Sequence, residues 1–439
     1  MYKFIDLFSG CGGLSLGLVS AGLKGQFAIE RDPMAFSTFA DNFLGDRLVP
    51  VAKFAWPSWL EQQAWPIDDL LAAHRADLQR LQGTIDVLAG GPPCQGFSFA
   101  GKRQESDPRN QLFEKYADVV DTIRPRALVL ENVPGMGVAH STKGNADGKR
   151  VAGTESYFHK LKRTLEGLGY DVRGEVLDAS RYGVPQKRSR LIVLGLRRDV
   201  AAHLPGGIDR AFELLEEKRR AHLRELGLPE TIWACDAISD LRTDDAPLRD
   251  CTDPFSRGPF KEAVHSAPKT TYQRLMHVHC VEMDSMRLAR HGEVVRNRFA
   301  AILQECNRGG NMNRASREKY GIKKQRLHPM SFSEPAPTIT TLPDDVLHYA
   351  EPRILTVRES ARLQSFPDWF RFRGKFTTGG AKRTKECPRY TQVGNAVPPY
   401  LGRVIGFAVA AALDESADAE ARQLIAARQQ ELQQPFAIA

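Results

Sequence analysis

Residues 84–98 constrain the fold more than any other stretch of the chain. Residues 84–89 form a short β-branched and apolar run, which predicts a buried parallel strand. The sequence continues Gly90-Gly91-Pro92-Pro93-Cys94, so we expect the Cys94 thiol just beyond the carboxyl end of that strand, where open α/β sheets bind their ligands. The two prolines fix φ and remove two backbone donors, which predicts a stiff approach that holds the thiol in one place. A Pro-Cys pair alone would more often mark a buried structural cysteine after a turn.

Two carboxylates follow other predicted strands. Residues 25–30 read as a second strand that ends in Glu30, and residues 126–130 read as a buried strand that runs into Glu131. Glu131 and Cys94 are therefore expected at the same edge of one sheet. A thiol and a carboxyl in one cleft are suited to nucleophilic catalysis with acid assistance.

The N-terminus predicts a cradle for a nucleotide-like ligand. A strand over residues 2–8 is followed by Ser9-Gly10-Cys11-Gly12-Gly13 and then by an apolar helical stretch to about residue 21. The glycine spacing does not match the dinucleotide fingerprint, which argues against a nicotinamide or flavin cofactor. Glu30 is placed either to accept hydrogen bonds from a ribose diol or to start the following helix, and position alone leaves both interpretations open.

Composition indicates a soluble protein that tolerates a polyanionic partner. The 439 residues predict two domains, and the net charge is +8. Lysines and arginines gather near residues 181–198, 218–224, 314–326 and 371–389, although the second of these groups also fits a plain solvated helix face. The late apolar run over residues 404–413 is too short to cross a bilayer, and no basic-then-apolar leader opens the chain. We expect a cytoplasmic protein without a membrane partner.

The cysteines indicate free thiols. There are seven, scattered and without a Cys-x-x-Cys pair, which argues against a disulfide framework and a zinc finger. His277-Val278-His279-Cys280 has the composition of a metal-site fragment, but no second cluster stands at ligand spacing, so no metal is expected.

The regular strand–helix alternation ends after Arg198. Residues 172–178 and 191–196 predict a strand pair, with Arg188 and Arg190 on one face. Residues 199–325 are irregular and polar and predict a second, smaller domain, whereas residues 1–198 and 326–439 form the first. The last residues, 416–434, predict a solvated helix or a frayed tail.

Taken together, these motifs resemble the cytosine-C5 DNA methyltransferases. The matching blocks stand in family order and cover nearly the whole chain except much of residues 199–325. They are Asp6-Leu7-Phe8-Ser9-Gly10-Cys11-Gly12-Gly13, Gly91-Pro92-Pro93-Cys94-Gln95-Gly96-Phe97-Ser98, Glu131-Asn132-Val133, Gln186-Lys187-Arg188-Ser189-Arg190, Arg326 with Pro335-Ala336-Pro337-Thr338-Ile339, and Gln392-Val393-Gly394-Asn395.

The resemblance implies a fold and a reaction. The fold is α/β, with a Rossmann-like, mixed but mostly parallel sheet, helices on both faces and a smaller target-recognition domain. The reaction moves a methyl group from S-adenosylmethionine to C5 of a flipped cytosine in a specific duplex DNA sequence. By resemblance, Cys94 is the nucleophile that adds to C6, Glu131 is the acid at N3, and Arg190 steadies the base O2.

The resemblance also assigns binding residues. The cofactor set comprises Phe8, Ser9, Gly10, Cys11, Gly12, Gly13, Glu30, Asp68, Asn395 and Val397. The acid that holds the adenine amino group is the poorest match: Asp68 is our choice, Asp69 is an alternative, and residues 54–56 could occupy its place. Arg31 stands where the family often has an aromatic residue after the strand-two acid.

The implied partners are double-stranded DNA and a cognate restriction endonuclease encoded nearby. The resemblance assigns DNA contacts to Ser98 and Arg188. An RNA methyltransferase of the same family is the nearest alternative, but the Cys-Phe-Thr tripeptide of that branch is absent. An inactive DNA-binding relative is a further alternative, although it would not need to keep Cys94, Glu131 and Arg190.

Overall fold

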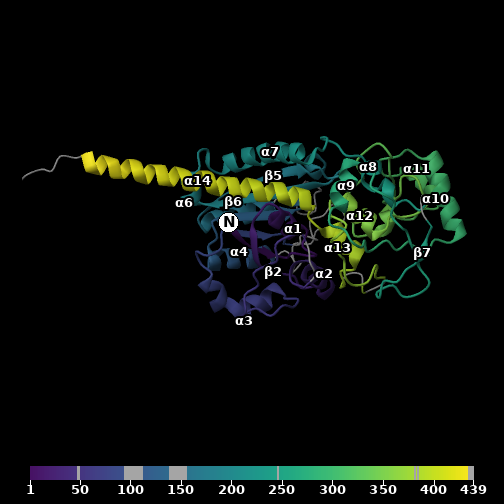
Figure 1. The fold of residues 1–439 in the computed structure, drawn as a ribbon, viewed down its shortest axis with the longest axis horizontal. Coiled ribbons are helices and arrows are strands. Elements are labelled where there is room, and N and C mark those ends of the chain that lie inside the picture. Colours follow the sequence, from purple (N-terminus) through teal and green to yellow (C-terminus); the bar gives the residue numbers. More distant parts are fainter. Residues whose placement is uncertain are drawn as a thin grey trace, which may run out of the picture.

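A six-stranded sheet with helices on both faces forms the larger lobe of the protein (Figure 1). The computed structural model describes residues 1–46, 50–92, 112–137, 156–244, 247–379, 382 and 385–433, so Cys94 and Ser98 lie outside the described residues. The strand order is β2-β1-β3-β4-β6-β5. The strands are β1 (Lys3–Leu7), β2 (Lys24–Ile29), β3 (Val87–Gly90), β4 (Ala127–Asn132), β5 (Tyr170–Asp178) and β6 (Ser189–Arg197).

Strand direction confirms the expected Rossmann-like fold. Strands β2, β1, β3 and β4 run parallel, whereas β6 runs antiparallel to both β4 and β5. The predicted strand pair over residues 172–178 and 191–196 is therefore β5 and β6. Because β6 is antiparallel, it begins at the edge of the sheet where β4 ends.

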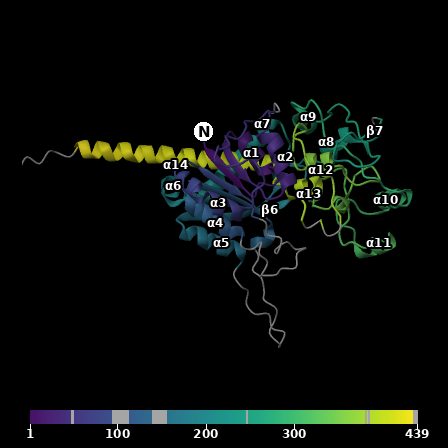
Figure 2. The same ribbon diagram turned by 90° about the horizontal axis from the view of Figure 1, so that it is seen from below.

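Helices cover both faces of the sheet because successive strand residues point to opposite sides. In β4, Ala127 and Val129 belong to one core, whereas Leu128 and Leu130 belong to the other. The second core is closed by α3 (Ile67–Arg80), α4 (Leu112–Ile123) and α5 (Tyr157–Gly167) (Figure 2). The first core is closed by α1 (Gly13–Ser20), α2 (Pro33–Phe43), α6 (Arg198–His203), α7 (Gly207–Leu226) and α14 (Pro399–Gln433).

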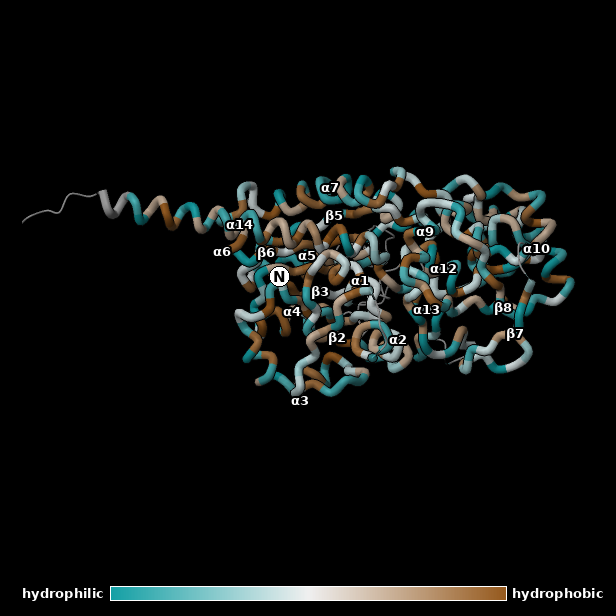
Figure 3. Tube along the Cα trace, in the orientation of Figure 1, coloured by the Kyte–Doolittle hydropathy of each residue, from teal (hydrophilic) through white to brown (hydrophobic). Residues whose placement is uncertain are grey.

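The structure differs from the expected domain boundaries at the start of the smaller lobe. Residues 199–226 form α6 and α7, which pack on the sheet layer instead of joining the second domain. Helix α7 contains many hydrophilic residues (Figure 3), but Leu214, Leu215 and Leu223 are buried in the first core. Arg210 of α7 also makes two hydrogen bonds to Glu415 of α14. The sequence predicted a charged helix here but not its contact with a helix 200 residues away.

The end of the smaller lobe also lies later than expected. Leu327, Leu347 and Ile354 share a small hydrophobic cluster with Phe299 and Ile302, so the lobe continues past residue 325. Its elements are α8 (Ala234–Ile238), β7 (Arg249–Asp250), β8 (Lys261–Glu262), α9 (Thr271–His277), α10 (Glu293–Glu305), α11 (Arg314–Lys319), β9 (His328–Pro329), β10 (Val346–Leu347) and α12 (Val357–Leu363).

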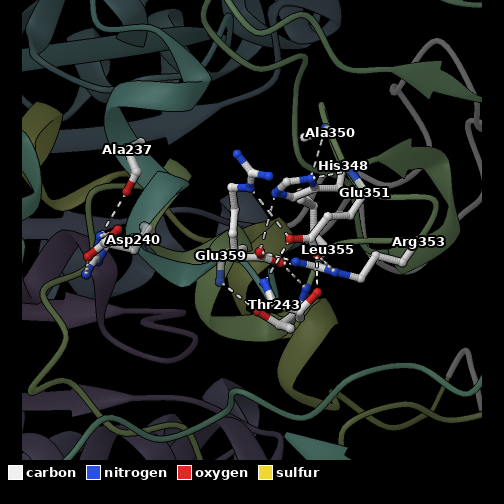
Figure 4. A network of polar contacts seen from close by, with 12 residues as sticks. Ala237, Asp240, Thr243, His348, Ala350, Glu351, Arg353, Leu355 and Glu359 are labelled. Atoms are coloured by element: carbon white, nitrogen blue, oxygen red, sulfur yellow. Dashed lines mark hydrogen bonds and ion pairs between the residues drawn. The ribbon is translucent and has the colours of Figure 1, made fainter. Parts of the chain in front are cut away.

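Buried ion pairs stabilise this lobe in addition to its apolar core. Arg353 donates to Glu351 and makes two hydrogen bonds to Glu359, whose side chain is fully buried (Figure 4). Glu359 also accepts from the backbone N–H of Thr356 and completes a capping box at the start of α12. Such a network is satisfied only in one arrangement, so it fixes the path of the chain through an otherwise irregular region.

The long C-terminal helix α14 joins the core by its first half and extends away from the body beyond it (Figure 1). Leu401, Val404, Ile405 and Ala408 are fully buried. In the part of the chain that the structure describes, the segment Arg389–Gln429 passes a length and composition test for a membrane span, but 72% of its apolar window is buried in the protein. The apolar character of α14 is thus explained by its contact with α1 and α7.

Two glycines allow α1 and α14 to approach closely. A Cβ at Gly17 would lie 2.5 Å from the backbone carbon of Gly402, a separation that atoms do not adopt. We expect Gly17→Ala to lower the free energy of unfolding by about 1–3 kcal/mol, because the two helices must separate. Gly167→Ala, at a helical position with open space around it, is expected to stabilise slightly. Urea unfolding of both variants tests this, and a Gly17→Ala protein as stable as the wild type would contradict the close packing.

Candidate active site

Glu131 and Arg190 meet at the carboxyl edge of the sheet. Glu131 lies near the end of β4 and Arg190 near the start of β6, and antiparallel pairing of these strands brings the two side chains together. The Arg190 Nε lies 2.7 Å from the Glu131 Oε1, and their side chains are only 13% and 11% exposed. The structure therefore brings together two of the three residues that the sequence predicted for catalysis.

The chain that leads to Cys94 passes beside this pair. The Asn132 side-chain amide donates a 2.9 Å hydrogen bond to the Pro92 carbonyl. A Cβ at Gly91 would lie 3.4 Å from the Glu131 Oε2, so the backbone of Gly91 lies directly beside this carboxyl oxygen. Cys94 itself is outside the described residues, and its position two residues further along stays a prediction. The sequence had given Asn132 no role, although it stands inside a matching block.

The glycine-rich turn between β1 and α1 has the backbone of a ligand cradle. Gly10 and Gly12 have φ of 57° and 94°, which favour glycine, and Phe8 shares this left-handed conformation at 59°. A Cβ at Gly12 would lie 2.5 Å from the Phe43 ring. Space is open where a Cβ at Gly10 would lie. The turn is therefore tightly packed at Gly12 and open at Gly10.

Glu30 joins this turn to the end of β2. Its carboxylate accepts hydrogen bonds from the backbone N–H groups of Gly10, at 3.0 Å, and Asp32, at 2.7 Å. Burial raises the pKa of Glu30, and these two hydrogen bonds oppose that shift. Ser9 precedes Gly10 in the same turn. Its Oγ is buried and has no hydrogen-bond partner among the described residues. An acceptor with spare lone pairs and an unpaired hydroxyl fit a ligand that carries hydroxyl and amino groups.

The C-terminal segment contacts the same turn. A Cβ at Gly13 would lie 2.3 Å from the Val397 carbonyl oxygen, so the two segments touch. The Cys11 Sγ lies 3.7 Å from the Gln392 carbonyl in the neighbouring helix α13 (Arg389–Asn395). Asn395 is exposed at the end of α13, where its amide is free to meet a ligand.

Asp68 is not joined to the cradle by any contact that we observe among the described residues. It lies exposed in the first turn of α3 and pairs with Lys115 at 3.1 Å. The residue of this region that contacts Glu30 is Trp65, whose backbone N–H donates a hydrogen bond to the Glu30 backbone carbonyl. In the alternative segment over residues 54–56, Phe54 is buried in the aromatic core, where its ring packs edge-on against Phe4. The residue that holds adenine stays a prediction.

Arg188 differs from its expected role. It is 1% exposed and donates to the carbonyls of Ile339, Gly394 and Ala396 at 2.9–3.1 Å, so its guanidinium is not available to a DNA phosphate. Burial also holds the pKa of this guanidinium well below its usual range. Strand alternation correctly places Arg188 and Arg190 on the same face. It cannot show that the segments around Ile339 and residues 394–396 bury Arg188.

Gln186 is a second residue whose role the sequence did not reveal. Its side chain is fully buried, accepts from the Ile339 N–H and donates to the Leu363 carbonyl. A polar residue two positions before Arg188 in the same motif was the available signal. Together Gln186 and Arg188 fix the chain around Ile339 against the start of β6.

Arg188 and its neighbour Lys187 provide a matched pair of variants. Arg188→Met leaves three buried carbonyls without their donor, so we expect a loss of at least about 3 kcal/mol in the free energy of unfolding. Lys187 makes a single exposed ion pair with Glu334, and Lys187→Met is expected to cost about 0–1 kcal/mol. Equal losses for both in chemical denaturation would rule out the structural role of Arg188.

Comparison with known proteins agrees with this site. The family model described as C-5 cytosine-specific DNA methylase matches residues 2–410. Type II methyltransferase M.DdeI of Desulfomicrobium norvegicum is 30% identical over 92% of this chain and 87% of its own length. Type II methyltransferase M.XorII of Xanthomonas oryzae pv. oryzae is 30% identical over 93% of this chain and 84% of its own length.

A solved structure shows the same fold. It belongs to a protein described as a DNA modification methyltransferase encoded within a prophage (E. coli), and it superposes with a TM-score of 0.62 at 24% identity, over 94% of this chain and all of that one. The family match spans the sheet, the Glu131–Arg190 pair, the glycine cradle and most of the smaller lobe. The chain thus belongs to the C-5 cytosine-specific DNA methylases and is a DNA (cytosine-5-)-methyltransferase.

Proposed function

We propose that this enzyme methylates cytosine within a specific duplex DNA sequence through a covalent bond between Cys94 and C6 of the base. The observation that carries the proposal is the Glu131–Arg190 pair, which stands beside the Gly91–Pro92 approach to Cys94. Cytosine C5 is a weak nucleophile, and addition of a thiolate to C6 moves electron density onto C5. Cys94 is the residue positioned by sequence to make that addition.

Glu131 and Arg190 act on the polar edge of the base in this proposal. Glu131 donates a proton to N3 of the base. The protonated ring can then take up the electron density that the addition of the thiolate supplies. Arg190, fixed by its contact with Glu131, donates to O2 and orients the base. After methyl transfer a base removes the C5 proton, the bond between Cys94 and C6 breaks, and 5-methylcytosine is released.

S-adenosylmethionine supplies the methyl group, and the cradle has the chemistry to bind it. The Glu30 carboxylate has lone pairs left for the ribose hydroxyls after it accepts from Gly10 and Asp32. The open space over Gly10 and the nearby Ser9 hydroxyl supply room and a polar partner. Phe8, Cys11, Gly12 and Gly13 shape the turn, and Asn395 and Val397 complete the site from the C-terminal side.

The target base must leave the duplex before Cys94 can reach it. Extrusion of one base costs a few kcal/mol, which DNA contacts must offset. We assign those contacts to the smaller lobe, whose basic side chains would hold phosphates and read the major groove, and to Ser98. Because relatives are named Type II methyltransferases, we also infer a cytoplasmic role beside a restriction endonuclease.

Transfer of labelled methyl groups tests the proposed substrate. The wild-type enzyme with methyl-labelled S-adenosylmethionine is expected to place 5-methylcytosine in genomic duplex DNA and not in bulk tRNA. Cys94→Ala, with the same fold and cofactor affinity, should give no label. Label confined to tRNA would move the substrate to RNA, and undiminished label with Cys94→Ala would exclude the covalent route.

The proton donor can be tested apart from the nucleophile. Glu131→Gln keeps the side-chain shape but cannot transfer its proton, and we expect kcat to fall by about 10²–10⁴-fold. The matched control is Glu213→Gln on α7, an exposed acid that should leave kcat unchanged. Single-turnover rates with saturating DNA give the comparison. An unaltered rate for Glu131→Gln would contradict its role at N3.

A further inference from the structure

A half-buried cluster of metal-ligand types lies in the smaller lobe. Atoms of His277, Cys280 and Asp368 that can bind a metal all lie within 4.8 Å of one another. His277 ends α9, and Asp368 comes from the turn after α12, so two distant segments meet here. We propose that these three side chains bind one divalent ion of the zinc class, a site separate from the proposed methyl-transfer reaction.

The backbone is shaped to bring the three donors together. The Cys280 N–H donates to the His277 carbonyl in a tight turn, and His279 within it adopts a φ of 61°, which side-chain-bearing residues rarely do. The Asp368 N–H donates to the carbonyl of Met276, one residue before His277. A strained turn that points two ligand types at one carboxylate is typical of a functional constraint.

Charge favours a cation at this point. Arg362 is fully buried and makes hydrogen bonds to two carboxylates, those of Asp240 and Asp368. One guanidinium and two carboxylates leave a formal charge of −1 in the interior, which is costly unless it is balanced. The other nearby guanidinium, Arg358, is paired with Asp284. A divalent ion with the Cys280 thiolate adds a net charge of +1 and balances the cluster.

The donor set suits zinc. Imidazole nitrogen, thiolate sulfur and carboxylate oxygen are the ligands that zinc binds in tetrahedral sites. The His277 Nδ1 lies 3.1 Å from the Asp368 Oδ2, so a metal would replace the proton between them. The centroid of the His265 ring lies 5.0 Å from that of the His277 ring, but His265 is not among the donors that lie within 4.8 Å of one another, so the three protein ligands leave the fourth position open.

Metal titration of the untagged full-length protein tests the site. After dialysis against a chelator, Zn²⁺ is expected to bind at about one equivalent per chain, and Co²⁺ to give a thiolate charge-transfer absorption band. Cys280→Ser and His277→Gln should lose both, whereas Cys306→Ser, a partly buried cysteine elsewhere in the lobe, should keep both. Absence of stoichiometric binding to the wild type would overturn the proposal, with protonated His277 then the balancing charge.

A second measurement needs no variant and so does not depend on folding of a mutant. Zn²⁺ is expected to slow alkylation of Cys280 in the native wild-type protein, while Cys306 in the same sample reacts at an unchanged rate. Peptide mapping after alkylation separates the two thiols. Equal rates at Cys280 with and without Zn²⁺ would overturn the site. Since methyl transfer is not the readout, these results are independent of the proposed function.

Discussion

Arg188 joins the start of β6 to two segments from later in the chain, and the geometry of the active site depends on that contact. Its buried guanidinium donates to the carbonyls of Ile339, Gly394 and Ala396, which lie 151 to 208 residues later in the chain. The same C-terminal turn touches Gly13 through the Val397 carbonyl. One arginine thus fixes the segment that we propose to complete the cofactor site to the strand that carries Arg190. These contacts stabilise the fold, because a buried carbonyl without a hydrogen-bond donor raises the free energy of the folded state.

The direction of β6 explains how the polar residues gather. A parallel strand next to β4 would begin at the opposite edge of the sheet, far from Glu131. Because β6 is antiparallel, its first residues lie at the carboxyl edge, where β3 leads to Pro92 and β4 ends at Asn132. Arg190 therefore meets Glu131 by topology. The smaller lobe has buried ion pairs beside its apolar core, such as Arg353 with Glu359, and these fix the path of a region with few regular strands.

Local patterns predicted the sheet and the residues at its edge. Apolar runs ending in Glu30 and Glu131 located two strand ends correctly, and the glycine-rich motif predicted the tight turn between β1 and α1. The domain boundaries and the role of Arg188 could not be predicted, because both depend on contacts between distant segments. The apolar stripe of α7 does not say which layer it covers, and strand alternation does not show what buries Arg188. The proximity of Asp368 to His277 and Cys280 could not be predicted either, because these residues are also distant in the sequence.

Trapping the covalent bond tests the central claim most directly. In duplex DNA copied from genomic sequence with 5-fluorocytosine in place of cytosine, the fluorine cannot be removed as a proton is, so the bond between the enzyme and C6 persists after methyl transfer. The account predicts a complex that survives denaturation, requires S-adenosylmethionine, and maps to the peptide that contains Cys94. Methylation of ordinary DNA without such a complex, or a complex that maps to another cysteine such as Cys11, would contradict it.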